Sequence, residues 1–246
     1  MLLCLCLKKI TYICLLLCLI GCNKTVTTTT SSSQITFCAD SAYQFVQQQV
    51  AFGPRVPGTQ AHTDCALFLL EKLSDFGAQV VLQQGNMMNY AGESQDVFNV
   101  IGKFGQSKQN GTILLCAHYD TRPWSDEEEL YENRFSPVMG ANDGASGVGV
   151  ILEIVRQLSI RKSKGDFIPS VQIVFFDCED MGTPAHFTGV QREHTWCLGS
   201  QLWAREYKNS TLNSQLSTLN CQYGILLDMV GDPSATFPRE YFSVQY

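Results

Sequence analysis

The sequence lacks the features that would assign it to several common classes of protein. Its 17 lysine and arginine residues are outnumbered by 23 aspartate and glutamate residues, giving a formal net charge of −6. Nucleic-acid-binding proteins carry a basic face instead. No glycine-rich segment is followed by the Gly-Lys-Ser/Thr of a phosphate-binding loop, and the chain has no internal repeat. These absences argue against nucleic acid as a partner and against phosphate binding through a glycine-rich loop.

Cysteine is frequent, but its spacing argues against a metal site built from thiolates. Four of the 11 cysteines lie before residue 19, and a fifth is Cys22. The other six form no CxxC pair. Some of them could form disulfides in an exported protein, and the alternative is that Cys65, Cys116 and Cys178, which lie in apolar patterns, pack as small buried residues. These six are Cys38, Cys65, Cys116, Cys178, Cys197 and Cys221.

The N-terminal apolar run is shorter than the roughly 20 residues that a membrane-spanning helix needs. Two lysines precede it, and it ends in Leu-Ile-Gly-Cys, a pattern typical of a secretory signal and similar to a bacterial lipobox. We therefore predict a lipoprotein signal peptide over residues 1–22, with Cys22 as the lipidated residue. An uncleaved anchor helix is the alternative. Asn23 favours the outer membrane, so the exported protein would face the periplasm and touch the membrane through its lipid only.

The remaining chain divides into a tether and one domain. Residues 23–38 contain a threonine- and serine-rich run without hydrophobic periodicity, which predicts a flexible tether. Residues 39–246 suffice for a single domain with one core. Hydrophobic periodicity predicts helices over 39–52, 62–77, 144–158 and 198–207, strands over 78–84, 96–104, 112–118, 171–177 and 223–230, and a further strand beginning at 241.

Strongly apolar strands separated by amphipathic helices predict an α/β sandwich around a largely parallel or mixed sheet, in which the strand at 223–230 is buried. Ligands of such sheets bind beyond the carboxyl ends of the strands. Three of the apolar strands end in acidic or imidazole side chains, and an Asn-Asp-Gly segment precedes a helix. We therefore expect six side chains to converge: His118, Asp120, Asp143, Glu179, Asp180 and Asp228.

These carboxylates and the imidazole cannot share a partly buried pocket unpaired, because desolvated like charges repel each other. A bound divalent cation removes that conflict. Imidazole and carboxylate donors without thiolates suit a catalytic zinc ion. A single strand-end aspartate is often only a cap, and a single histidine is often only structural, so the prediction depends on the whole set.

Five segments carry a resemblance to a known family. They are GPRVPGTQAH, CAHYDTRPW, GANDGASGVGVILEIVRQL, FFDCEDMG and LLDMVGDPSATFPRE. In this order they resemble the zinc-dependent peptidase family M28, and within it they look most like the bacterial glutaminyl-peptide cyclotransferases (glutaminyl cyclases). The resemblance extends over nearly all of the domain. It implies a three-layer sandwich with a central mixed, mostly parallel sheet, as in zinc exopeptidases.

The resemblance also implies a reaction and roles for four residues. A glutaminyl cyclase is a zinc-dependent acyltransferase that converts the N-terminal glutamine of a peptide or protein to pyroglutamate and releases ammonia. Asp143 and Asp180 would bind one zinc ion. Glu179 would be the general acid and base, and Asp228 would position the substrate amine or hold the proton network.

His118 and Asp120 would support this site without binding the metal, because the cyclases hold one zinc where the aminopeptidases hold two. The family has a further histidine ligand well beyond the strand that ends at Asp228. No candidate histidine follows Asp228 here. The third ligand is therefore expected beyond Tyr246, and the domain is expected to be incomplete at its C-terminus.

Two other functions remain open. In an M28 aminopeptidase, His118 and Asp228 would bind a second zinc ion, Asp143 would bridge the two ions, and Glu179 would activate a metal-bound water. A non-catalytic binding lipoprotein with the same fold is the other alternative, because only Asp143 and Asp180 are assigned as ligands.

Several further residues have two interpretations. Trp124 and Trp196 could line a substrate pocket or pack against neighbouring elements. We expect the His62 side chain to be solvated or to cap a helix. Gly144 and Gly147 are expected to permit close packing beside the metal site.

Overall fold

The computed structural model describes residues 36–105, 111–208 and 221–237 of the 246-residue chain. The predicted signal peptide, most of the predicted tether and the strand expected from residue 241 lie outside these residues. Within the described part, no helix is both long and apolar enough to cross a bilayer.

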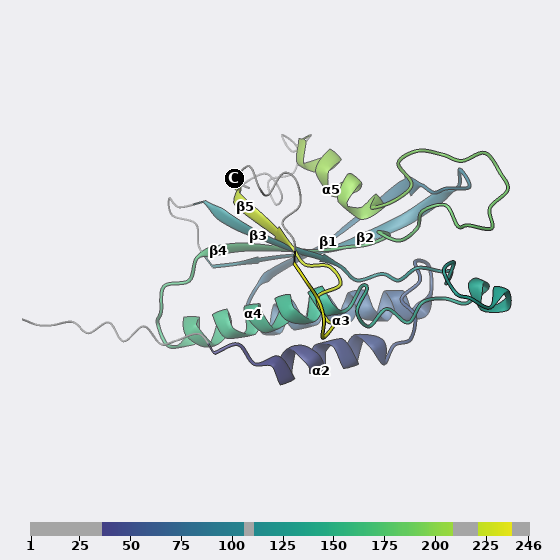
Figure 1. Ribbon diagram of the computed structural model, residues 1–246. Coiled ribbons are helices and arrows are strands. Elements are labelled where there is room, and N and C mark those ends of the chain that lie inside the picture. Colours follow the sequence, from purple (N-terminus) through teal and green to yellow (C-terminus); the bar gives the residue numbers. More distant parts are fainter. Residues whose placement is uncertain (1–35, 106–110, 209–220, 238–246) are drawn as a thin grey trace, which may run out of the picture. The chain divides into compact units, whose positions relative to one another are not determined.

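Helices cover both faces of the sheet (Figure 1). Helices α3 (Gln60–Asp75) and α4 (Ser146–Ser163) pack against one face, and α2 (Ala39–Val50) packs on α4. Helix α5 (Leu198–Lys208) contacts β1 and β2 from the opposite face. A short 3-10 helix, η1 (Tyr131–Phe135), lies in the loop before α4. These layers confirm the predicted α/β sandwich.

The described sheet has five strands in the order β1-β2-β4-β3-β5. They are β1 (Gln79–Met88), β2 (Ser94–Phe104), β3 (Thr112–His118), β4 (Ser170–Phe176) and β5 (Cys221–Leu226). Strand β3 pairs in parallel with β4 and β5, whereas β2 is antiparallel to β1 and to β4. The sheet is therefore mixed, as predicted. Because β3, β4 and β5 are parallel, their carboxyl ends lie at the same end of the sheet.

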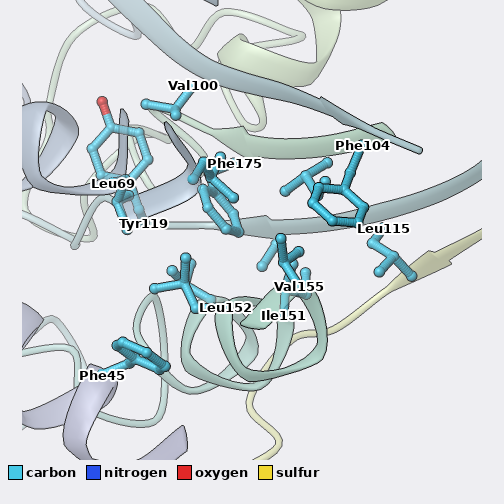
Figure 2. Close-up of a cluster of buried hydrophobic side chains, with 14 of the residues drawn as sticks. Phe45, Leu69, Val100, Phe104, Leu115, Tyr119, Ile151, Leu152, Val155 and Phe175 are labelled. Carbon is cyan, nitrogen blue, oxygen red and sulfur yellow. The ribbon is translucent and has the colours of Figure 1, made fainter. Parts of the chain in front are cut away.

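The core lies between the sheet and the layer of α3 and α4 (Figure 2). The apolar stripes of the two helices face apolar side chains from β2, β3 and β4, and each fully buried leucine, isoleucine or phenylalanine contributes about 1.5–3 kcal/mol. This packing holds the strand ends that carry the polar residues. Fully buried members of the cluster include Leu69, Leu73, Val100, Ile151, Leu152, Val155, Ile173 and Phe175.

Strand β5 corrects one prediction. The sequence predicted a buried strand, but all six residues of β5 are exposed. Within the described part of the chain, β5 pairs with β3 alone and forms an edge of the sheet. Its apolar residues identify a strand because β-propensity is local. Their burial depends on which element covers the strand, and local sequence does not encode that.

Candidate metal and catalytic site

The predicted site residues come together at the carboxyl edge of the parallel strands. The donor atoms of His118, Asp143 and Asp180 lie within 4.8 Å of one another, and so do those of His118, Glu179 and Asp228. The elements explain this convergence: His118 and Asp120 end or follow β3, Glu179 and Asp180 follow β4, Asp228 follows β5, and Asp143 precedes α4.

His118 lies at the centre of the cluster. Its Nε2 atom lies 2.9 Å from Asp143 Oδ1 and 3.5 Å from Asp228 Oδ1, and its Nδ1 atom lies 3.4 Å from Asp120 Oδ1. Burial disfavours the charged imidazole, but the three carboxylates outweigh that effect and raise the pKa of His118 far above its ordinary value. The cluster therefore stabilises positive charge at this position.

The acidic side chains of the cluster are partly buried and repel one another. Burial, together with the charges of Asp120 and Asp143, raises the pKa of Asp180 to about 7. Burial also raises the pKa of Glu179, which the nearby His118 opposes. A divalent cation would remove this repulsion and keep the carboxylates ionised. Imidazole and carboxylate donors at this spacing fit zinc.

Asp120 fixes the segment that follows β4. Its side chain is fully buried, and its two carboxylate oxygens accept the backbone N–H groups of Glu179 and Asp180 at 3.1 and 3.3 Å. The preceding residue, Cys178, has φ 52°, a left-handed conformation that a side chain disfavours and that surrounding contacts must hold. Asp120 thus sets the position of the acid pair relative to the end of β3.

The loop after β5 is held against the loop before α4. Val230 N–H donates to Ser146 Oγ at 3.0 Å, and Gly231 N–H donates to Asn142 Oδ1 at 2.7 Å. These bonds cross more than 80 positions of sequence. They place Asp228 next to His118, although no motif in the sequence links the two loops.

Two glycines allow this close approach, as expected. A Cβ atom at Gly147 would lie 2.1 Å from the carbonyl oxygen of Leu227, and one at Gly144 would lie 2.5 Å from that of Asp120. Gly144 also has φ 96°, which glycine adopts without steric cost. A larger residue at Gly147 would push away the segment that carries Asp228, and one at Gly144 would push the Asp143 turn away from the end of β3.

Asp177 belongs to a separate buried network behind the site. Its Oδ1 atom lies 2.7 Å from His62 Nε2, and its Oδ2 atom accepts the Phe98 N–H at 2.7 Å. The Tyr119 hydroxyl lies 3.0 Å from the same histidine nitrogen. Since the side chains of His62 and Asp177 are both 0% exposed, the expectation that His62 is solvated or caps a helix is wrong. The pair joins residues 115 positions apart, so no local pattern indicates it.

A cavity of about 660 Å³ adjoins the cluster at Asp180 and is lined by Trp124 and Trp196. The Arg122 guanidinium lies 5.5 Å from the Trp124 ring centroid and 4.8 Å from that of Trp196. Arg122 Nη1 also donates to the carbonyl oxygen of Asp180 at 3.0 Å. Both tryptophans lie in the wall of this cavity beside the acid pair, and Trp124 also packs against the rings of Tyr90 and His186, so the geometry is compatible with both interpretations. Sequence analysis did not identify Arg122, which connects that wall to Asp180.

Known proteins resemble this chain in both sequence and structure. The sequence model of peptidase family M28 matches residues 99–242. A Bacteroides thetaiotaomicron glutaminyl cyclase solved with N-acetylhistamine is 42% identical, with a TM-score of 0.73 over 82% of this chain and 65% of that one. For a Tannerella forsythia glutaminyl cyclase the values are 45%, 0.75, 86% and 68%.

A zinc-dependent exopeptidase from Parabacteroides distasonis is also similar, with 44% identity and a TM-score of 0.72 over 82% of this chain and 64% of that one. No curated protein matches the chain. The chain spans about 65% of the length of the Bacteroides thetaiotaomicron enzyme. The site geometry, the family match over more than half of the sequence and these similarities show that the chain belongs to peptidase family M28.

Proposed function

We propose that this protein is a zinc-assisted glutaminyl-peptide cyclotransferase, which converts the N-terminal glutamine of peptides or proteins to pyroglutamate and releases ammonia. One observation carries the proposal. The donor atoms of His118, Asp143 and Asp180 lie within 4.8 Å of one another, with Glu179 adjacent in sequence to Asp180, in a chain 42% to 45% identical to bacterial glutaminyl cyclases.

Asp143 and Asp180 would hold the zinc ion, because their donor atoms belong to one group at the end of the parallel strands. A further histidine ligand beyond Tyr246 remains part of this proposal, because catalytic zinc sites ordinarily have three protein ligands. When bound, zinc would polarise the side-chain carbonyl of the substrate glutamine as a Lewis acid.

Glu179 would move the protons. The α-amine of the N-terminal glutamine attacks its own side-chain carbonyl carbon, so one C–N bond forms and the bond to the departing nitrogen breaks. Glu179 would accept the proton that the amine loses and return one to the departing ammonia. A carboxylate whose pKa is raised by burial is a stronger base than a solvated one, and Asp120 fixes its backbone. The acyl group moves from one nitrogen to another, which makes the enzyme an acyltransferase.

Asp228 would hold the substrate amine. Its hydrogen bond with His118 lowers the pKa of Asp228, so the group stays anionic while Glu179 gains and loses a proton. Two acidic groups whose pKa values are shifted in opposite directions suit two different roles. The Asp228 side chain is 41% exposed, which lets a substrate reach it. The cavity with Trp124 and Trp196 would hold the peptide near this carboxylate.

The substrate test uses two peptides that differ only in their first residue, glutamine or leucine. With zinc supplied, we expect ammonia and a pyroglutamyl peptide from the first and no change in the second, because cyclisation requires the side-chain amide of glutamine. Mass spectrometry of the products and an ammonia assay measure this outcome. Release of a free N-terminal amino acid from either peptide would contradict a cyclase.

An aminopeptidase is the second candidate, and a specific observation favours it. His118 and Asp228 belong to a second donor group beside the one that contains Asp143 and Asp180, which suits the binding of a second ion. The 44% identity to the Parabacteroides exopeptidase lies between the 42% and 45% identities to the two cyclases. Release of leucine from the second peptide would support this candidate.

We also propose that the chain is an exported lipoprotein anchored through Cys22. The support is the short apolar run that ends in Leu-Ile-Gly-Cys. A Cys22→Ser variant should no longer incorporate labelled fatty acid, because serine has no thiol to acylate. A Cys18→Ser variant inside the predicted signal serves as the control and should be labelled normally. Unchanged labelling of the Cys22→Ser protein would refute lipidation at this cysteine, whereas membrane retention without labelling would favour an uncleaved anchor helix.

A further inference from the structure

Arg55 is a fully buried cation in the connection between α2 and α3. Its guanidinium donates only to backbone carbonyls among the described residues. Nη1 donates to Met139 O at 2.5 Å, Nη2 to Gly140 O at 2.5 Å, and Nε to Tyr119 O at 3.3 Å. A weaker contact from Nη1 reaches Gly53 O at 3.4 Å. No ion pair joins it to a carboxylate within the described part of the chain.

This environment is costly for an arginine. The guanidinium keeps its charge inside proteins, and moving such a charge out of water costs several kcal/mol unless a partner compensates. A methionine would fill a similar volume without burying a charge. Global stability alone therefore does not explain an arginine at this position, and its contacts indicate what it does instead.

The three strongest contacts connect the two loops that build the candidate metal site. Tyr119 lies between His118 and Asp120 at the end of β3, and Gly140 begins the turn that carries Asp143. The backbone oxygen of Arg55 also accepts the N–H of Thr121 at 3.1 Å, so the residue binds the β3 loop through its main chain as well.

The turn before α4 is shaped around the guanidinium. Gly140 has φ 65°, and a Cβ atom there would lie 2.8 Å from Arg55 Nη2. A Cβ atom at Gly144 would lie 3.3 Å from the same nitrogen. Glycines at both ends of the 140–144 turn thus let the backbone approach Arg55 closely, and Asp143 lies between them.

We propose that Arg55 is a positioning residue for the metal site: its planar guanidinium holds the 139–144 segment against the end of β3, so that the Asp143 carboxylate meets His118. The inference rests on the proposed function only where it concerns zinc. The planar arrangement of donors in the arginine guanidinium is essential to this role. The ammonium group of a lysine has no fixed donor directions, so it could not hold two adjacent carbonyls and a third one opposite.

The test compares Arg55→Met and Arg55→Lys in the full chain with the wild type. Both variants should bind zinc about 10–100-fold more weakly, as for other residues that orient metal ligands, when affinity is measured by competition with a chelator. Both should also show faster hydrogen exchange at amides 139–145. Leu69→Ala is the control. Leu69 is a fully buried core residue of α3, so its loss should lower the melting temperature without changing either readout in the folded protein.

The outcomes separate this inference from the proposed function. Wild-type zinc affinity and exchange in both variants would overturn the positioning role. Recovery of both readouts by lysine but not methionine would also overturn it, because charge would then replace geometry as the explanation. If the wild type binds no zinc, the proposed function fails, and exchange at 139–145 still decides the role of Arg55. If Arg55→Met does not fold, Arg55→Lys carries the same test.

Discussion

A Glu179→Gln variant is expected to retain zinc and to cyclise N-terminal glutamine at least about 100-fold more slowly than the wild type. The amide has nearly the shape of the carboxylate, but it cannot accept a proton from the substrate amine. The backbone N–H of residue 179 would still donate to Asp120, so the local structure should be retained. Turnover of a glutamine peptide and bound zinc are measured on the same sample.

Glu71→Gln is the matched control, because Glu71 is an exposed residue of α3, and its rate should equal that of the wild type. An unchanged rate in Glu179→Gln would remove Glu179 from the mechanism. Loss of zinc together with activity would instead assign Glu179 to the donor group that it forms with His118 and Asp228. That result would contradict its role as the general acid and base.

An Asp143→Ala variant is expected to bind zinc more than about 100-fold more weakly than the wild type. Mutation of a residue that only supports a metal ligand costs up to roughly 100-fold in affinity, and loss of a ligand itself should cost more. Asp143 supplies a donor atom of the candidate site, and its Oδ1 atom lies 2.9 Å from His118 Nε2. Its removal deletes one zinc ligand and also removes a carboxylate that contacts the His118 imidazole. Zinc content after dialysis and chelator competition measure the loss, and turnover should fall with it.

Asp75→Ala provides the comparison, because Asp75 is an exposed residue at the end of α3, where a carboxylate makes only a surface ion pair with Lys72. Such pairs contribute about 0–1 kcal/mol, so zinc binding should not change. An Asp143→Ala protein that keeps the full zinc content and affinity would place the metal elsewhere. The proposed roles of Asp143 and Asp180 would then both fall.

The order of elements could be predicted because each depends on local patterns. The spacing of Leu69 and Leu73 predicts the face that α3 buries, and the apolar run before His118 predicts β3. The site could be predicted for a related reason. Parallel strands end at the same edge of a sheet, so polar residues after several apolar strands share a location even when more than 100 positions separate them. His118 and Asp228 illustrate this, with Nε2 and Oδ1 3.5 Å apart.

Other features depended on the tertiary structure. Asp177 lies two residues before Glu179 and looks equivalent to it in sequence, yet it pairs with His62 behind the site. Arg55 lies in a glycine- and proline-rich turn, which shows nothing of the carbonyls at residues 119, 139 and 140 that surround its guanidinium.

The sequence by itself determined the helices, the strands and the acidic edge at which they end, because hydrophobic periodicity and strand direction are properties of the chain read in order. Only the tertiary structure decided which buried charge meets which partner and that β5 is exposed. Side-chain hydrogen bonds between distant segments form according to where the packed elements bring them, and that placement follows from the whole core.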